Sequence, residues 1–246
     1  MAVVIFAPAR WFSAFIGVLT AWGLYEVAAM FKVRDPVGLL TVAVAGGGLA
    51  AATLWGARVG WQLAAAVIIA SSANVWLLAR CGPERLRRNR ILNVTAASLW
   101  VGALFPYFAL LRNSANGVLA VILMLLLVVA SDSGAYFAGR SLGRIKLAPT
   151  VSPNKTIEGA EGGLAACVVA AMILGQWLAP GLRLWSLVFL AVCVGVLAQL
   201  GDLAGSAFKR IAGVKDSGWL FPGHGGLLDR TCSLVFAVVF TYYYLR

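Results

Sequence analysis

The sequence is short of the residues that a water-soluble domain needs on its surface. Charged residues make up only 12% of the 246 residues, whereas 61% are hydrophobic, and there is a single histidine, His224. This balance excludes an ordinary soluble domain and predicts a polytopic helical membrane protein. No polar stretch is long enough to form a second core, so we expect one continuous membrane domain.

Cysteine is scarce as well, and its spacing argues against a metal site. The four cysteines are Cys81, Cys167, Cys193 and Cys232, and none is paired at a metal-binding spacing. Cys167 and Cys193 lie inside apolar runs, where cysteine packs as a small hydrophobic residue. The opening residues MAVVIFAPAR have no basic segment and no small-residue cleavage site, so no signal peptide is expected.

Acidic residues are fewer than basic ones, which gives a formal net charge of +11. Such a charge can indicate nucleic-acid binding, but here the cations lie in short loops between apolar runs and not on a soluble basic face. We therefore expect no nucleic-acid partner. A positive surface beside the membrane, facing anionic lipids or phosphates, fits the pattern better.

Long apolar runs predict an all-α fold of about eight transmembrane helices, because a helix needs about 20 residues to cross a bilayer. The expected spans are roughly 11–31, 37–56, 59–79, 93–111, 116–138, 158–179, 184–208 and 226–245. Residues 1–9 are apolar but too short to cross, and we expect them to be the end of a helix whose start is missing.

The loops on the two sides of these spans differ strongly in positive charge. One side carries 15 of the 20 Lys and Arg residues, and the other carries Arg10, Arg58, Arg112, Arg183 and Arg246. The positive-inside rule places the richer side in the cytoplasm. The arginines of residues 80–90 alone give the same orientation, and we attribute them to topology. Both polar loops of the second half would then face the cytoplasm, where nucleotides are found.

The acidic residues divide the chain into two parts. Of the nine, only Glu26, Asp35 and Glu84 precede residue 130. Ionisable groups at a membrane boundary are costly and usually mark a functional site. We therefore expect residues 1–130 to form a scaffold of transmembrane helices and residues 131–246 to form the catalytic region with two polar loops.

The more polar loop spans residues 206–230 and lies between two apolar helices. Its ionisable residues are Lys209, Arg210, Lys215, Asp216, His224, Asp229 and Arg230. On the helix before it, Asp202, Ser206 and Lys209 share one face. Gly201 and Gly205 on that helix form a small-residue pair that lets a neighbouring helix approach closely.

A magnesium–nucleotide site would suit this loop. Asp229 starts the last helix, where the helix dipole favours an anion, and Asp202 lies at the end of the helix before it. Mg²⁺ is typically held by one or two carboxylates together with substrate phosphates. Gly223, Gly225 and Gly226 would let backbone amides approach phosphate oxygens.

The second polar stretch, residues 131–163, begins with Asp132 inside or at the end of an apolar span. Ser152 or Thr156 could cap the helix that begins near Glu158, and a helix N-terminus beside Lys155 can seat a phosphate. The glycines here match neither a P-loop nor a dinucleotide fingerprint. We expect the substrate-binding residues to be Asp132, Ser152, Pro153, Lys155, Thr156, Glu158, Ser206, Gly225 and Gly226.

Each of these charges also has a simpler interpretation. A single lysine or arginine at a helix end can anchor that end at the membrane surface, and a nearby acid can pair with it. The density of such residues within about 30 positions of the second loop favours a site. For residues 131–163 alone, the two interpretations are equally good.

The order of these residues resembles the signature of the phosphatidate cytidylyltransferases, also called CDP-diacylglycerol synthases. The matching residues are Ser206-x-Phe208-Lys209-Arg210, Lys215-Asp216, Pro222-x-His224-Gly225-Gly226-x-x-Asp229-Arg230, Asp132-x-Gly134-Ala135-Tyr136-x-x-Gly139 and Ser152-Pro153-x-Lys155-Thr156-x-Glu158-Gly159. The resemblance is close over residues 131–245. The first half matches only as apolar spans, with Leu24-Tyr25-Glu26 where the family often has an aromatic–Glu pair.

The resemblance implies an integral enzyme of the bacterial cytoplasmic (inner) membrane, commonly a homodimer, with its active site facing the cytoplasm. Such an enzyme condenses CTP with phosphatidic acid to give CDP-diacylglycerol and diphosphate in phospholipid biosynthesis. The resemblance also implies Mg²⁺, with K⁺ as a second cation, and it maps the metal-binding aspartates onto Asp202 and Asp229.

The resemblance also suggests a role for each remaining residue. The cations Lys209, Arg210, Lys215 and Arg230 would neutralise the triphosphate and the lipid phosphate. Lys155 and Ser152 would hold the nucleotide from the other loop, and His224 and Asp216 would be positioning groups.

The chain departs from the family pattern in two places. The signature ends Asp-Arg-x-Asp, and here the last position is Cys232, so one carboxylate is absent. By comparison with the family pattern, we also expect the N-terminus to be short by most of one helix.

Two alternatives therefore stay open. One is a related CTP-dependent enzyme acting on a polyprenyl or ether lipid, and the other is a catalytically degenerate membrane scaffold. A transporter is disfavoured because the charges gather at one membrane face. A CDP-alcohol phosphatidyltransferase is disfavoured because its run of spaced aspartates with glycine is missing.

Overall fold

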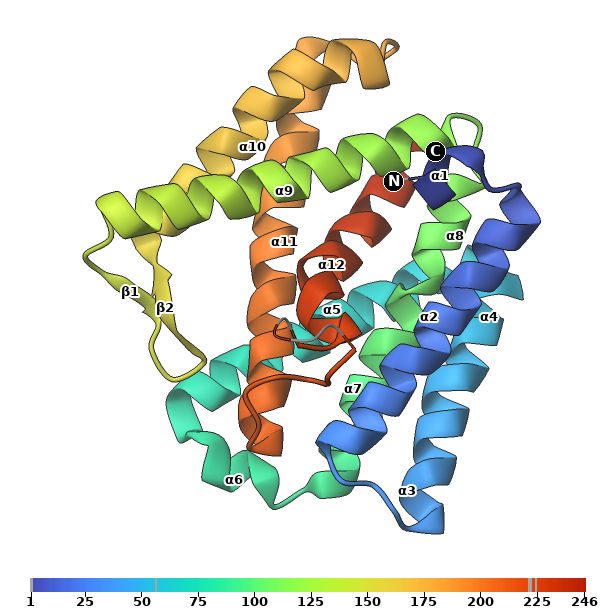
Figure 1. Ribbon diagram of the computed structural model, residues 1–246, viewed down its shortest axis with the longest axis vertical. Coiled ribbons are helices and arrows are strands. Elements are labelled where there is room, and N and C mark those ends of the chain that lie inside the picture. The colour runs from blue at the N-terminus through green and yellow to red at the C-terminus, as the bar shows by residue number, and fades with distance from the viewer. Residues whose placement is uncertain (1, 56, 221–222, 224) are drawn as a thin grey trace.

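The computed structural model describes residues 2–55, 57–220, 223 and 225–246, and these are helical almost throughout (Figure 1). The helices are α1 (Ala2–Phe6), α2 (Ala9–Met30), α3 (Pro36–Thr41), the π-helix η1 (Val42–Gly48), α4 (Leu49–Trp55), α5 (Ala57–Cys81), α6 (Pro83–Arg87), α7 (Arg90–Leu104), α8 (Pro106–Arg112), α9 (Gly117–Ser141), α10 (Ile157–Leu178), α11 (Leu184–Ala212) and α12 (Leu227–Leu245). Between α9 and α10 lies an antiparallel hairpin of β1 (Lys146–Ala148) and β2 (Ser152–Thr156).

Seven helical segments of the described chain are long and apolar enough to cross a membrane. They are Ala9–Met30, Pro36–Thr53, Gly60–Cys81, Arg90–Arg112, Gly117–Ser141, Ile157–Leu178 and Leu184–Ala212. They coincide with seven of the eight spans expected from the sequence. The protein is therefore a polytopic all-α membrane protein, as predicted.

The eighth predicted span is the helix α12, which is not among those seven. Its first turn carries Asp229 and Arg230, which lower its hydropathy. Its middle is enclosed by protein, since Val235, Phe236 and Val238 are each 0% exposed. Helix α12 thus packs among other helices, and its apolar face meets side chains where an outer helix would meet lipid.

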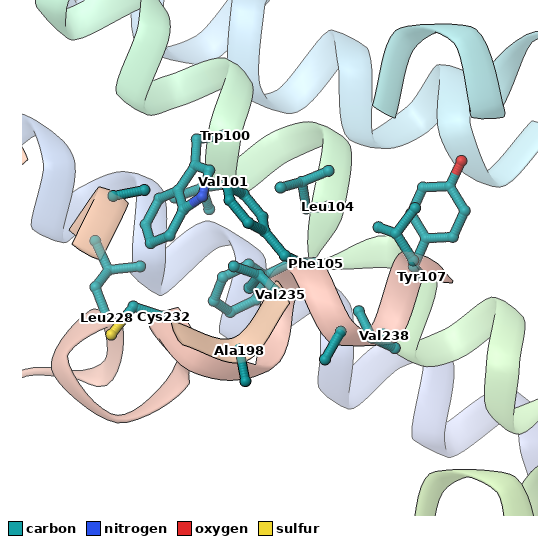
Figure 2. Packing of buried hydrophobic residues seen from close by; sticks show 14 of the residues in the cluster. Trp100, Val101, Leu104, Phe105, Tyr107, Ala198, Leu228, Cys232, Val235 and Val238 are labelled. Atoms are coloured by element: carbon teal, nitrogen blue, oxygen red, sulfur yellow. The ribbon is translucent and has the colours of Figure 1, made fainter. Parts of the chain in front are cut away.

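The core joins the two halves of the chain (Figure 2). Trp100 of α7 lies near Leu228 and Cys232 of α12, and Phe105, directly after α7, lies near Val235 of α12, and all five are buried. One hydrophobic cluster therefore includes residues from both 1–130 and 131–246. The division into scaffold and catalytic region stays a prediction.

Glycines bring the helices around α11 close together. A Cβ atom on Gly205 would lie only 2.7 Å from the Cβ of Cys232 on α12. The neighbour expected for the Gly201 and Gly205 pair is thus α12. On α9, a Cβ atom on Gly134 would lie 2.5 Å from the Cβ of Ala166 on α10. Each contact brings together the two helices on either side of one polar loop.

Hydrogen bonds connect the four basic loops that were predicted to share one side. Arg90 donates to two carbonyls at the end of α2, at 3.3 and 2.8 Å, and forms an ion pair with Asp35 at 3.0 Å. Arg87 donates to two carbonyls at the end of α11, each at 3.1 Å. Arg210 donates to the Val151 carbonyl at 3.3 Å. The four loops therefore meet at one end of the bundle, and Arg87 and Arg90 have structural contacts beyond the topological role expected of them.

Asp35 also starts helix α3. Its carboxylate accepts a hydrogen bond from the Gly38 amide at 2.8 Å. That bond, helped by the Arg90 guanidinium, lowers the pKa of Asp35 below its ordinary value. The cap and the ion pair together hold the α2–α3 connection against α7.

The hairpin lies at the shared end of α9 and α10 (Figure 1). Thr156 caps α10, since its hydroxyl accepts a hydrogen bond from the Gly159 amide at 3.1 Å, whereas Ser152 lies in β2. Of the two caps considered, Thr156 is therefore confirmed. The Glu158 carboxylate accepts hydrogen bonds from the amides of Arg144 and Ile145, which fixes the start of the hairpin. The sequence patterns did not predict the two strands.

Candidate active site

A cleft of about 580 Å³ opens between α9, the hairpin, α10 and α11. Its described polar lining residues are Asp132, Tyr136, Arg140, Asn154, Lys155, Thr156, Gln199 and Asp202. Asp132 comes from α9, Lys155 from β2 and Asp202 from α11. The fold thus brings two acids that are 70 positions apart into one cleft with a cation.

Asp202 and Lys155 form the central ion pair of this cleft. Lys155 Nζ lies 2.5 Å from Asp202 Oδ2, with side-chain exposures of 26% and 36%. Asp132 interacts electrostatically with both residues. Two carboxylates near a membrane boundary need positive charge. Lys155 and Arg140, which both line the cleft, supply it.

Besides Asn154 of β2, three polar lining residues were not selected from the sequence as site residues. Gln199 precedes Asp202 by almost one turn and donates to the Ala160 carbonyl at 2.9 Å, which joins α11 to α10 beneath the cleft. The Arg140 guanidinium donates to the Tyr136 hydroxyl at 2.9 Å. The signal that could have found them is position: all three lie three or four residues from another polar lining residue on the same helix.

A second polar cluster surrounds Asp229 at the start of α12. Lys209 Nζ lies 2.6 Å from Asp229 Oδ1, and both side chains are largely buried. Asp229 Oδ2 accepts hydrogen bonds from the Ser217 amide at 2.8 Å, the Ser217 hydroxyl at 3.0 Å and the Gly226 amide at 2.9 Å. Both carboxylate oxygens therefore already have donors.

Glu26 of α2 lies on the other side of Ser217. It is 2% exposed, and its carboxylate accepts hydrogen bonds from the Leu227 amide at 2.7 Å, the Leu228 amide at 3.0 Å and the Ser217 hydroxyl at 2.9 Å. The Trp22 indole donates at 3.2 Å. Sequence reasoning placed Glu26 only in an aromatic–Glu pair and did not select it for the site. The contact between Glu26 and α12 could not be predicted because the two are far apart in the sequence.

Cys232 lies between the two clusters. Its Sγ is 3.4 Å from Asp202 Oδ1, and the residue is 3% exposed, below Trp100 and beside Leu228 (Figure 2). Asp229 is not among the described residues that line the large cleft. It borders a cavity of only about 10 Å³, together with Lys209, Ser217 and Cys232. Asp202 at the cleft and Asp229 at the smaller cavity thus lie on either side of Cys232.

The remaining predicted residues lie around these two clusters. Lys215 and Asp216 are exposed in the loop after α11, and Arg230 is exposed on the first turn of α12. Ser206 is partly buried on α11, one turn beyond Asp202. Arg210 and Glu158 hold the hairpin, as described above. Ser152 and Pro153 belong to β2 but are not among the residues that line the cleft.

The glycines of the second loop approach carboxylates. Gly225 has a φ of +83°, and a Cβ atom there would lie 2.5 Å from Asp229 Oδ2. A Cβ atom on Gly226 would lie 2.5 Å from Glu26 Oε2. The predicted contacts with phosphate stay predictions. His224 and Pro222 lie outside the described residues.

The fold and the cleft define a class: a polytopic membrane protein whose charged cleft lies where basic loops meet at the helix ends. The model of the cytidylyltransferase family matches residues 1–246, the full sequence, and the protein belongs to that family.

Two of the three curated relatives described next are named phosphatidate cytidylyltransferase. The chain is 41% identical over 153 residues to the phosphatidate cytidylyltransferase of Bacillus subtilis, covering 62% of this chain and 57% of that protein. It is 46% identical over 134 residues to the phosphatidate cytidylyltransferase of Haemophilus influenzae, covering 52% and 46%. It is 42% identical over 134 residues to the Escherichia coli protein YnbB, covering 54% and 45%. The chain thus spans about half the length of the curated relatives it matches.

Members of the cytidylyltransferase family generally use a divalent metal ion. In the described part of the chain, no three His, Cys, Asp or Glu side chains gather as a metal cluster. Mg²⁺ needs only one or two carboxylates if substrate phosphates and water complete its shell. Asp132 and Asp202 face the same cleft, but Asp202 fits such an ion only if Lys155 moves away, because Lys155 Nζ lies 2.5 Å from its Oδ2. Asp229 fits it only if Lys209 moves away, because both of its oxygens are already engaged.

Proposed function

We propose that this protein is a phosphatidate cytidylyltransferase, which converts CTP and phosphatidic acid into CDP-diacylglycerol and diphosphate. The observation that carries the proposal is the Asp202–Lys155 ion pair with Asp132 beside it, in a cleft at the membrane boundary. These residues belong to the stretch of the sequence that resembles the family signature. The names of the two bacterial enzymes above support the same activity.

The proposed reaction is an in-line substitution at phosphorus. A phosphate oxygen of phosphatidic acid forms a new bond to the α-phosphorus of CTP, the bond from that phosphorus to the bridging oxygen breaks, and diphosphate leaves with its electron pair. The lipid phosphate is already largely ionised at pH 7, since the second pKa of a phosphate monoester is about 6. No strong base is needed, and catalysis rests on positioning and charge neutralisation.

The cleft residues would share this work. Lys155 and Arg140 would bind phosphate oxygens, and Asp202 with Asp132 would hold the divalent ion. When bound, Mg²⁺ with K⁺ as a second cation would supply neutralisation of the triphosphate charge. A metal role for Asp229 stays a prediction, as do phosphate contacts of Lys209, Arg210, Lys215 and Arg230.

The same proposal places the protein in the bacterial cytoplasmic membrane. The relatives are bacterial, and the end of the bundle where the basic loops meet would face the cytoplasm by the positive-inside rule. CTP is found on that side. A homodimer is the expected assembly, and membrane lipid is the expected surrounding partner.

The test is turnover of the purified protein in detergent with labelled CTP and phosphatidic acid, with and without Mg²⁺. We expect metal-dependent CDP-diacylglycerol. Asp202→Asn should lower turnover at least 100-fold, because it removes the carboxylate that faces the cleft. Asp35→Asn is the matched control, since Asp35 lies outside the cleft and should change turnover less than twofold. Absence of product from the wild type would refute the activity, and near-normal turnover of Asp202→Asn would refute the role of Asp202.

One observation favours a second candidate, a catalytically degenerate scaffold. Cys232 replaces a family aspartate at a position 3.4 Å from Asp202. If this substitution has removed activity, the wild type will make no CDP-lipid from phosphatidic, polyprenyl or ether lipids, while Cys232→Asp will make it. Product from the wild type with a polyprenyl or ether lipid alone would instead identify a related enzyme.

A further inference from the structure

Glu26 is a buried carboxylate to which the proposed reaction gives no role. It lies in the first span, at 2% exposure. Its four described donors are neutral groups: two backbone amides, one hydroxyl and one indole. Burying a carboxylate is costly unless it is well hydrogen-bonded. Such a group is retained where its contacts fix something that the protein needs.

What Glu26 contacts is the element that carries Asp229. The Leu227 and Leu228 amides form the first turn of α12, two residues and one residue before Asp229. The Ser217 hydroxyl lies 2.9 Å from Glu26 Oε2 and 3.0 Å from Asp229 Oδ2, so one side chain joins the two carboxylates. Lys209 then joins Asp229 to α11. The chain of contacts runs from the first span to the second polar cluster.

Two glycines of the α11–α12 loop pack tightly against the Glu26 side chain. A Cβ atom on Gly226 would lie 2.5 Å from Glu26 Oε2, and one on Gly218 would lie 2.8 Å from Oε1. Real Cβ atoms do not approach an oxygen that closely, so both positions require glycine for this packing. The loop between α11 and α12 therefore packs closely against the Glu26 carboxylate.

We infer that Glu26 is a positioning residue for the proposed cytidylyl transfer. It holds the α11–α12 loop and the first turn of α12, and through Ser217 it sets the orientation of Asp229 and its partner Lys209. Without the carboxylate, the Leu227 and Leu228 amides lose their acceptors in a buried place, the Ser217 hydroxyl keeps only Asp229 as its acceptor, and the loop must rearrange. This inference rests on the proposed function, and it makes the first span part of the site.

The kinetic test compares Glu26→Ala, Glu26→Gln and the control Glu84→Gln, whose side chain is 84% exposed. We expect Glu26→Ala to lower kcat per folded molecule 10- to 100-fold, the usual range for residues that orient a ligand-binding group, with KM for phosphatidic acid within twofold. Glu26→Gln should fall in between, because its amide oxygen still accepts from α12 while its NH₂ group can donate to the Ser217 hydroxyl. Glu84→Gln should match the wild type.

A purely structural role predicts a different pattern. The yield of folded Glu26→Ala would fall, but the molecules that fold would keep the wild-type kcat, and that result would overturn the inference. The double variant of Glu26→Ala and Ser217→Ala tests the connection through Ser217. Because the Ser217 hydroxyl also donates to Asp229, the loss in kcat of the double variant should be smaller than the product of the losses in Glu26→Ala and Ser217→Ala, and a full product would refute the relay.

Hydrogen exchange gives a readout that needs neither turnover nor metal. In Glu26→Ala, the Ser217, Leu227 and Leu228 amides should exchange at least tenfold faster than in the wild type, while the hairpin amides of Lys146 and Thr156 stay unchanged. If the wild type makes no CDP-lipid, the proposed function fails, and exchange still decides the positioning role. Unchanged protection of the three amides would overturn it.

Discussion

Replacing Cys232 by aspartate would place a second carboxylate against Asp202. Cys232 Sγ lies 3.4 Å from Asp202 Oδ1 and the residue is 3% exposed. At that separation, two negative charges repel by about 5 kcal/mol for an effective dielectric constant near 20. The 2.5 Å ion pair with Lys155 supplies about 7 kcal/mol of attraction on the same scale. One lysine therefore cannot satisfy both acids, and the variant should depend on a divalent cation.

The assay is thermal unfolding in detergent with EDTA and with Mg²⁺, beside the uncharged control Cys232→Asn. After relaxation and the response of Lys155, we expect roughly 3 kcal/mol of destabilisation in EDTA, which corresponds to a fall in Tm of roughly 6–12 °C for a chain of this size. Mg²⁺ should restore most of it in Cys232→Asp and little in Cys232→Asn. Equal unfolding temperatures of the two variants in EDTA would refute the reasoning. Either position 232 does not lie close to Asp202, or the local dielectric constant is much higher than about 20.

Three further predictions concern contacts outside the cleft. Lys209→Met leaves a largely buried carboxylate without its cation and should cost roughly 3 kcal/mol, seen as a lower Tm; an unchanged Tm would mean that the pair is solvated. Arg87→Met removes two hydrogen bonds to the end of α11 and should cost about 1 kcal/mol, whereas the exposed Arg88→Met should cost nothing measurable in the same melt; equal effects would contradict the contact. Gly226→Ala forces a methyl group onto the Glu26 and Ser217 oxygens and should reduce turnover at least tenfold, whereas Gly17→Ala, which meets open space, should not; normal turnover of the first variant would refute the tight fit.

The helices could be predicted from the sequence because length and hydropathy set them. Most predicted spans match one helix within a few residues, for example 158–179 against Ile157–Leu178. The span 37–56 instead covers α3, η1 and α4, and the span 93–111 covers α7 and α8. The placement of the four basic loops at one end of the bundle follows from the alternation of spans. The hairpin could not be predicted, because its strands have three and five residues and include Pro153, so no period is visible.

The pairing of charges at the candidate site could not be read from the sequence. Asp202 and Lys209 share a helix face by spacing, yet Asp202 pairs with Lys155 and Lys209 pairs with Asp229. Those choices depend on how α11 and α12 are rotated and how closely they approach at Gly205 and Cys232. Helix rotation is set by side-chain packing between elements. The spacing of residues along one helix gives no information about that packing.

The contact between Glu26 and Ser217 has a consequence for how this protein is made. The two residues are 191 positions apart, and at 5–20 residues per second the ribosome needs about 10–40 s to synthesise the intervening chain. During that time the first span is in or near the membrane, and its Glu26 carboxylate has not yet received the hydrogen bonds that the α12 amides donate. The nascent span must then be kept at the lipid surface or shielded by the insertion machinery until α12 is made. The contact between α2 and α12 thus forms late in assembly, and a chain stalled before α12 would expose this charge to quality control.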